Sequence, residues 1–119
     1  MRVARGRQAA DRMNKTEAEY AALFLGRRPH GFEEVTLRLG DDCRYTPDFW
    51  VLGDDDVLEF HEVKGRWEDD AKVKIRAAAE RYPQFRFLAF RKRPKAQGGG
   101  WVRERFGPPD ATAIPERSA

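Results

Sequence analysis

The chain has 119 residues, of which 40% are hydrophobic and 36% charged, with a formal net charge of +3, as expected for one globular domain with a core. A single cysteine, Cys43, excludes an internal disulfide and suits a reducing cytoplasm, and with two histidines it cannot form a structural zinc site within one chain. No apolar run approaches the roughly 20 residues of a membrane span, and none follows the basic start, so neither a membrane segment nor a secretory signal is expected.

The start of the chain combines a basic segment with a capped helix. Residues 1–12 are basic and lack apolar periodicity, which predicts a flexible segment before the domain. The first helix is expected to begin near Asn14, because Asn14 and Glu17 fit a capping box. A register that begins at Thr16 competes with this one. Gly26 suits the C-terminal cap of the helix.

Three strands are predicted after this helix. Apolar and polar residues alternate in the first, and glycine- and aspartate-rich segments separate the three. The strands are expected over residues 33–39, 44–52 and 57–64, with turns at residues 40–42 and 53–56. Because the links are short, these strands are predicted to form an antiparallel meander.

A second helix and one or two further strands complete the domain. The helix is expected over residues 68–82, with an apolar stripe formed by Ala71, Ile75, Ala78 and Tyr82. Residues 85–90 form a fourth strand, predicted to pair in parallel with the third because a helix connects them, and residues 101–106 form a short fifth. The chain is therefore predicted to be an α/β (α+β) domain over residues 13–106, with a mixed sheet flanked by helices. A Pro- and Ala-rich disordered tail is expected over residues 107–119.

Three charged residues at the ends of the predicted strands suggest a metal site. Asp48 follows a proline in one strand, and the next strand ends in Glu62 and Lys64, which share a face because they are two residues apart. Carboxylates hold Mg²⁺, and the backbone carbonyl of Val63 is a further oxygen ligand. Lys64 would orient a water or neutralise a phosphate, and Glu17 would complete the set. An ion pair between Glu62 and Lys64 on a solvated strand end is the alternative.

Pro47-Asp48, thirteen further residues and then Glu62-Val63-Lys64 resemble the signature of the PD-(D/E)XK, or restriction-endonuclease-like, nucleases. Glu17 is similar to the first acidic motif of that superfamily, and the order of elements resembles its αβββαβ core. The segments NKTEAEY, YTPDF and EFHEVKG, followed by a lysine-rich helix, also resemble a small phage-associated domain. That domain is placed near the phage endonuclease I group of Holliday junction-resolving enzymes.

The resemblance implies a metal-dependent endodeoxyribonuclease that hydrolyses DNA phosphodiester bonds with Mg²⁺, for which Mn²⁺ substitutes, on branched or phage recombination and processing intermediates. It implies Asp48 and Glu62 as metal ligands, Lys64 as the catalytic lysine and Glu17 as the helical acid, favoured over Glu19. It implies a cytoplasmic protein of a bacterial or phage-infected cell and is compatible with a homodimer. The alternatives are a nucleic-acid-binding module that keeps the fold without cleaving, or a structural protein whose acids are incidental.

Basic residues near the predicted site are candidates for DNA contacts. Basic residues gather at both ends of the chain and acidic ones in the middle, a distribution that suits a polyanion gripped at its edges. The candidates are Arg66, Lys72, Lys74, Arg91, Lys92 and Arg93. Ordinary solvent-facing side chains are the alternative. His61 is predicted to lie on the face opposite Glu62 and to be structural.

Overall fold

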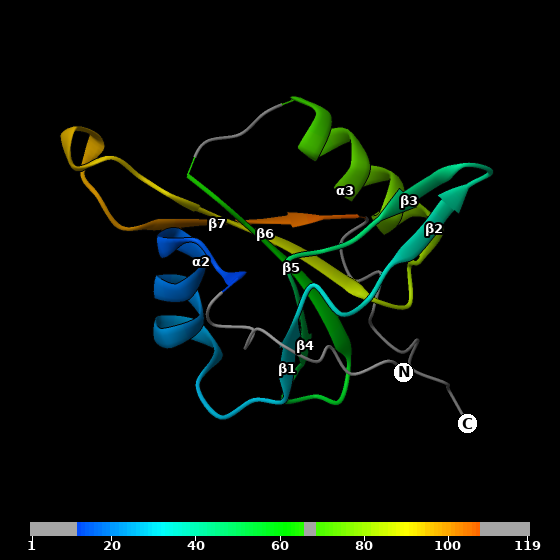
Figure 1. The fold of residues 1–119 in the computed structure, drawn as a ribbon, viewed down its shortest axis with the longest axis horizontal. Helices are drawn as coiled ribbons and strands as arrows, with labels where there is room; N and C mark the ends of the chain where they lie inside the picture. The colour runs from blue at the N-terminus through cyan, green and yellow to red at the C-terminus, as the bar shows by residue number, and fades with distance from the viewer. Residues whose placement is uncertain (1–11, 66–68, 108–119) are drawn as a thin grey trace, which may run out of the picture.

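The computed structural model describes residues 12–65 and 69–107, which form an α+β arrangement (Figure 1). The helices are α2 (Lys15–Tyr20), which continues as the π-helical turn η1 (Ala21–Leu25), and α3 (Asp69–Arg81); η2 (Lys95–Gln97) is a short 3-10 helix. The strands are β1 (His30–Phe32), β2 (Leu37–Gly40), β3 (Cys43–Tyr45), β4 (Phe49–Leu52), β5 (Leu58–Lys64), β6 (Arg86–Lys92) and β7 (Trp101–Phe106). The flexible segment predicted for residues 1–12 and the tail predicted for 107–119 lie, apart from Arg12 and Gly107, outside the described residues.

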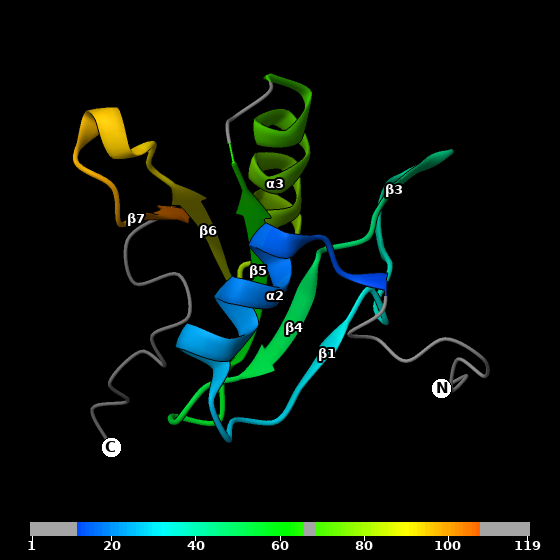
Figure 2. The same ribbon diagram turned by 60° about the vertical axis from the view of Figure 1, so that its left-hand side comes forward.

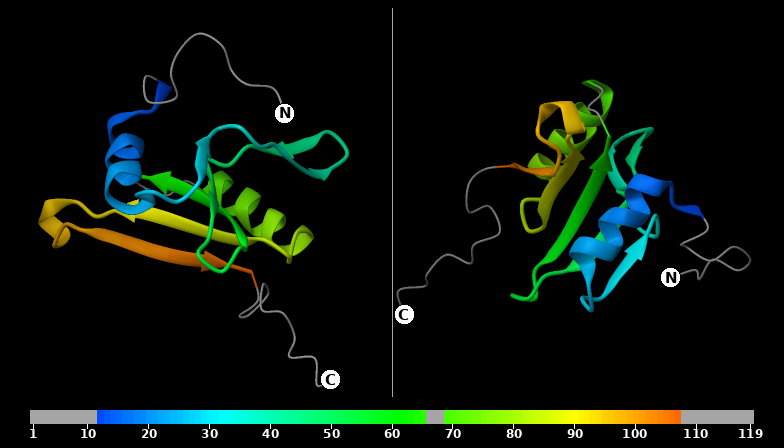
Figure 3. Two further views of the ribbon diagram at one scale, coloured as in Figure 1. Left: turned by 90° about the horizontal axis from the view of Figure 1, so that it is seen from below. Right: turned by 90° about the vertical axis from the view of Figure 1, so that its left-hand side faces the viewer.

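The main sheet has five strands in the order β1-β4-β5-β6-β7, and β2 and β3 form a separate two-stranded hairpin. Strand β5 pairs in antiparallel with β4 and in parallel with β6, which confirms the predicted parallel crossover through α3. Strand β7 has the bounds predicted for the fifth strand. The β2–β3 hairpin and the β6–β7 loop project from opposite ends of the molecule (Figures 1 and 3).

The predicted three-stranded meander was wrong. The strand expected over residues 33–39 begins only at Leu37, and the strand expected over 44–52 divides into β3 and β4, which belong to different sheets. The break contains Pro47, which lacks an amide donor and also restricts the residue before it, so the ladder ends there. Strand β1 was not predicted, because three residues centred on Gly31 carry no alternation.

The first helix begins as its sequence predicts. The side-chain oxygen of Asn14 accepts the amide of Glu17 at 2.8 Å, and the amide of Asn14 donates to a carboxylate oxygen of Glu17 at 2.9 Å. These two bonds form the capping box. The helix ends at Gly26, whose φ of +54° favours glycine. The Asn14 register is therefore confirmed over the one at Thr16.

Two hydrophobic cores lie on opposite faces of the main sheet, because successive residues of β5 point to opposite sides. Phe60 packs with Ile75 and Ala78 of α3 and with the β2–β3 hairpin. Val63 packs on the other face with Tyr20 of α2, and Figure 2 shows the two helices and the sheet between them. No helix among the described residues is both long and apolar enough to cross a membrane. The arrangement leaves the end of β5, with Glu62 and Lys64, beside the start of β4.

Candidate active site

Asp48 and Glu62 come together where β4 begins and β5 ends. The antiparallel register pairs Phe49 with His61, so the residue before Phe49 lies opposite the residue after His61. The backbone amide of Asp48 donates a hydrogen bond to Oε1 of Glu62 at 3.1 Å. Glu62 is only 5% exposed, and burial of a carboxylate requires such partners. Two acids that are 14 residues apart in the sequence thus form one site.

The β2–β3 hairpin contributes a further hydrogen-bond donor to Glu62, which was not predicted from the sequence. The hydroxyl of Tyr45, at the end of β3, donates to the same Oε1 of Glu62 at 2.6 Å. The hairpin is held against α3 by the hydroxyl of Tyr82, which donates to the carbonyl of Arg38 at 2.6 Å, and by apolar contacts of Leu37. Tyr45 therefore fixes the direction in which the Glu62 carboxylate points. Its place in the YTPDF segment was the only signal of this role, because nothing in the sequence shows that β3 leaves the main sheet.

The backbone of Val63 also faces Asp48. Its amide donates to Oδ2 of Asp48 at 2.8 Å. In an extended strand the amide and the carbonyl of one residue point toward the same edge, so the Val63 carbonyl is directed toward this side as well. The carbonyl oxygen of Val63, predicted as a metal ligand, therefore lies on the edge of β5 that faces Asp48.

Lys64 lies beside Glu62 and is accessible from outside. Its Nζ is 3.5 Å from Oε2 of Glu62, and its side chain is 35% exposed. Burial opposes the charged form, but Glu62 and Asp48 prevail and raise the pKa of Lys64 above its ordinary value. The lysine is thus an ammonium at neutral pH and can meet an incoming anion.

The carboxylates of the site repel one another. Burial, followed by the negative charge of Glu62, raises the pKa of Asp48 to about 7. Burial also raises the pKa of Glu17, and the charges of Asp48 and Glu33 add to this effect. Glu33 was not predicted as part of the site, since residue 33 was assigned to a strand; its amide donates to the carbonyl of Asp48 at 2.8 Å. A divalent cation bound between these carboxylates would neutralise their negative charges and remove the repulsion.

Glu17 and Glu19 point in different directions. Glu17 is close enough to Asp48 and Lys64 for their charges to act on its pKa. Glu19 instead pairs with Lys92 of β6, with 2.6 Å between Oε2 and Nζ. Of the two acids, Glu17 is therefore the one whose charge interacts with Asp48, while one of its oxygens accepts the Asn14 amide of the capping box.

The donor set fits a hard cation such as Mg²⁺. Among the described residues, no three Asp, Glu, His or Cys side chains form a ready-made metal site. Mg²⁺ is commonly held by one or two carboxylates together with water and substrate phosphates, so a pair of carboxylates is a sufficient protein contribution. Within the described chain, Oδ1 of Asp48 accepts no hydrogen bond, which leaves it for such a role. Oε2 of Glu62 accepts none from the backbone but lies 3.5 Å from Nζ of Lys64, so a cation there would share this oxygen with the ammonium.

The predicted DNA-contacting residues divide between the two faces of the sheet. Arg91 is the parallel partner of Lys64, and paired residues share a face, so Arg91 lies beside the site. Lys92 points to the opposite face and is engaged by Glu19. Lys74 donates to the carbonyl of Arg44 at 3.3 Å. Of the others, Lys72 is partly buried, Arg93 is exposed, and Arg66 lies outside the described residues.

His61 lies on the face opposite Glu62, as predicted, within a buried polar chain. Its Nδ1 hydrogen-bonds the hydroxyl of Tyr20, and its Nε2 is 2.8 Å from Oε1 of Glu59. Glu59 in turn pairs with Arg86 of β6. Burial lowers the pKa of His61, so the imidazole is neutral at physiological pH. Its hydrogen bonds account for the burial of this histidine.

Comparison with known proteins adds no relative: no protein-family model, curated protein or solved structure matches the chain. The functional interpretation therefore rests on the residues and the geometry described above.

Proposed function

We propose that this chain is a Mg²⁺-dependent endodeoxyribonuclease that hydrolyses phosphodiester bonds of DNA. The observation that carries the proposal is the convergence of Asp48, Glu62 and Lys64 at adjoining strand ends. The amide of Asp48 contacts the Glu62 carboxylate at 3.1 Å, and the Lys64 ammonium lies 3.5 Å from that carboxylate on its other side. Two carboxylates and a lysine arranged in this way match the chemistry that phosphodiester hydrolysis requires. The same arrangement supports the resemblance to the restriction-endonuclease-like class and its αβββαβ core.

Each side chain has a role that follows from its position. Asp48 and Glu62 would hold the cation, with the carbonyl of Val63 as a further oxygen. When bound, Mg²⁺ supplies Lewis-acid stabilisation of the charge that develops on the phosphate. Lys64 neutralises a non-bridging phosphate oxygen or orients the attacking water, and Glu17 orients water from the α2 side. Water adds to phosphorus and one P–O ester bond breaks, which leaves a phosphomonoester and a hydroxyl.

The setting of the site supports a nucleic-acid substrate. Arg91 adds a positive charge beside Lys64, and Arg93 lies exposed one residue past the end of β6. Guanidinium groups at the edge of a cleavage site position the backbone without reading its sequence. A cytoplasmic enzyme that accepts Mn²⁺ in place of Mg²⁺, and that acts as a homodimer on branched or recombining DNA, is the form of the proposal we favour.

The test is a cleavage panel of a four-way junction, a flap, a linear duplex and a single strand, each with Mg²⁺ or with EDTA. We expect the wild-type protein to cut at least one of these DNAs only when Mg²⁺ is present. Asp48→Asn and Lys64→Ala should each lower the cleavage rate by about a hundredfold or more, because each removes a group that stabilises the transition state.

The matched controls are Asp54→Asn and Arg81→Ala, which remove exposed charges of the same signs away from the site. Both should cleave like the wild type. DNA binding without nicking, weakened by salt in the wild type and in all variants alike, would instead identify a binding module. No cleavage of any substrate, with folding intact and Mg²⁺ or Mn²⁺ present, would contradict the proposal.

A further inference from the structure

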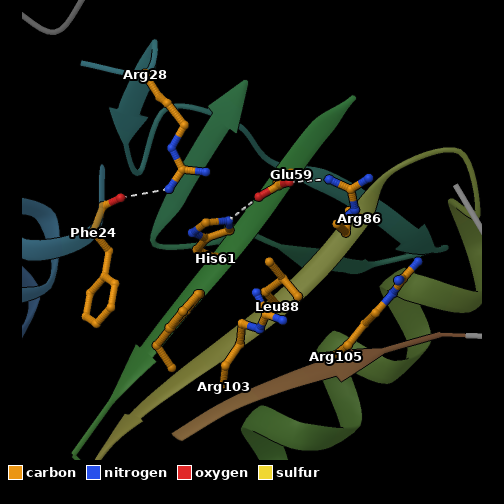
Figure 4. Close-up of a pocket in the computed structure, with 9 residues that line it drawn as sticks. Phe24, Arg28, Glu59, His61, Arg86, Leu88, Arg103 and Arg105 are labelled. Carbon is orange, nitrogen blue, oxygen red and sulfur yellow. Dashed lines mark hydrogen bonds and ion pairs between the residues drawn. The ribbon is translucent and has the colours of Figure 1, made fainter. Parts of the chain in front are cut away.

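A second polar site lies on the opposite face of the sheet from Asp48 and Glu62. It is a cavity of about 380 Å³, which falls within the range of roughly 300–1,000 Å³ typical of small-ligand pockets. Helix α2 covers only part of this face, and the cavity lies over β5, β6 and β7 (Figure 4). The described residues that line it include His61, Glu59 and Leu88, the aromatic rings of Phe24 and Phe90, and four arginines: Arg28, Arg86, Arg103 and Arg105.

The arginines come from separate parts of the chain. Arg28 precedes β1, and Arg86 begins β6. Arg105 and Arg103 lie on β7, opposite Leu88 and Phe90 of β6 respectively, so their side chains stand on the same face as these two apolar residues. Figure 4 shows these arginines around the cavity, from the loop before β1, from β6 and from β7. Only the folded sheet creates this concentration of positive charge.

The charges of the cavity are only partly balanced. Glu59 is the one acid that lines it among the described residues, and its carboxylate is already engaged by His61 at 2.8 Å and by Arg86. Arg86 is paired with Asp55 as well, at 2.6 Å. Nη2 of Arg28 donates to the carbonyl of Phe24 at 2.7 Å, which holds its guanidinium beside the cavity. The backbones of Arg103 and Arg105 belong to the β6–β7 ladder, but their guanidinium groups make no hydrogen bond or ion pair with the described residues, so these donors are available.

These donors suit a phosphate group. A guanidinium presents a planar fork of N–H donors that matches two phosphate oxygens, and paired arginines are the common solution for such anions. Phe24, a residue that is 38% exposed, lines the cavity, and its ring stacks on that of Tyr20 with 5.2 Å between the centroids. It adds an aromatic surface on which a nucleobase can stack. His61 and Glu59 are hydrogen-bonded to each other at 2.8 Å, and Glu59 also pairs with Arg86, so they form a polar floor in which the one acid already has partners.

We infer that this pocket binds the phosphate of a nucleotide, either free or within a single strand of nucleic acid, at a site separate from the candidate active site. Arg103 and Arg105 contact the phosphate, Arg28 adds a positive charge, and Phe24 receives the base. The inference does not depend on the proposed nuclease chemistry, because no group of the pocket belongs to the Asp48–Glu62 pair. On a nuclease, such a site would hold a strand or a product on the far side of the sheet.

The experiment measures binding of adenosine monophosphate, of adenosine and of a short single-stranded oligonucleotide by calorimetry, in EDTA and near physiological salt. EDTA separates this site from any metal-dependent binding. The test variant is Arg103→Ala with Arg105→Ala, and both positions are exposed on an edge strand, so the fold should be kept. The matched control is Arg27→Ala with Arg81→Ala, which removes the same charge from exposed positions outside the pocket.

The wild type should bind the phosphate-bearing probes and not adenosine. The double substitution in the pocket should weaken that binding by about tenfold or more, because two charge-assisted contacts are lost, while the control should change it less than about twofold. Binding of the free monophosphate would support a nucleotide as the ligand, and binding of the oligonucleotide alone would support a strand. Equal weakening by both double variants, equal binding of adenosine, or no binding of any probe would overturn the inference.

Discussion

Replacing Asp48 with asparagine should stabilise the metal-free protein while abolishing the proposed cleavage activity. Asparagine has nearly the same shape, and its oxygen can still accept the amide of Val63, which Asp48 now accepts at 2.8 Å. Its amide group is uncharged, so the repulsion between the two carboxylates is removed. The substitution thus removes the charge and keeps the contacts.

The size of the effect follows from the pKa of Asp48, which burial and the charge of Glu62 raise from 3.8 to about 7. The shift is roughly three pKa units, and each unit corresponds to about 1.4 kcal/mol. Ionised Asp48 therefore lowers the free energy of unfolding by at most about 4 kcal/mol. Because the protein relaxes around the charge and water reaches it, we expect Asp48→Asn to gain about 2 kcal/mol at pH 8.

The sign of the pH dependence is fixed by linkage. Asp48 binds its proton more tightly in the folded protein than in the unfolded chain, so its contribution to stability is fully present below pH 4. That contribution is lost as the pH rises from about 4 to about 7, and above this range the whole penalty applies. Asp48→Asn lacks this dependence, so its advantage over the wild type should be small at pH 5 and largest at pH 8.

The assay is urea denaturation in EDTA at pH 5 and pH 8, followed by tryptophan fluorescence. Asp54→Asn is the matched control, because it makes the same chemical change in an exposed turn and should alter stability by less than about 0.5 kcal/mol. An Asp48→Asn protein that is less stable than the wild type at pH 8 would contradict the expected gain. A difference between the two proteins that is the same at pH 5 and pH 8 would contradict the raised pKa of Asp48.

Three further predictions concern the proton on Asp48, the Tyr45–Glu62 hydrogen bond and the packing of Gly31. The apparent affinity for Mn²⁺, measured by calorimetry, should rise about tenfold per pH unit below pH 7 and level off above it, because a proton on Asp48 competes with the cation; a flat profile would contradict this. Tyr45→Phe removes the hydroxyl that donates to Glu62 at 2.6 Å and should cost about 1–2 kcal/mol in urea denaturation, whereas an unchanged midpoint would show that the contact is dispensable. Gly31→Ala places a Cβ 2.2 Å from the indole nitrogen of Trp50 and should cost about 1–3 kcal/mol, and a neutral result would mean that β1 shifts freely.

The pairing of Asp48 with Glu62 could be predicted because it depends on local patterns. The acidic turn after β4 is short, so β4 and β5 must pair in antiparallel, and this brings their distant ends together. The capping box at Asn14 and the parallel strand after α3 are local in the same sense. Each of these features requires only a turn or a cap that nearby residues specify.

The features that sequence reasoning missed depend on where distant segments meet. Strand β1 is defined by pairing with β4 and by the closeness of Gly31 to Trp50, and neither leaves a pattern within three residues. The contact of Tyr45 with Glu62 requires that the chain leave the main sheet at Pro47. The arginine pocket requires β7 to lie beside β6, which brings together residues as far apart in sequence as Arg28 and Arg105.

The central claim is that Asp48 and Glu62 together hold one divalent cation, and a Mn²⁺ titration followed by electron paramagnetic resonance tests it most directly. The wild type should bind Mn²⁺, and Asp48→Asn and Glu62→Gln should each weaken binding by about tenfold or more. The double variant should be little weaker than either single one, because ligands of the same ion are not additive, and Asp54→Asn should bind like the wild type. A wild-type protein that binds no Mn²⁺, or whose affinity neither substitution alters, would contradict the claim.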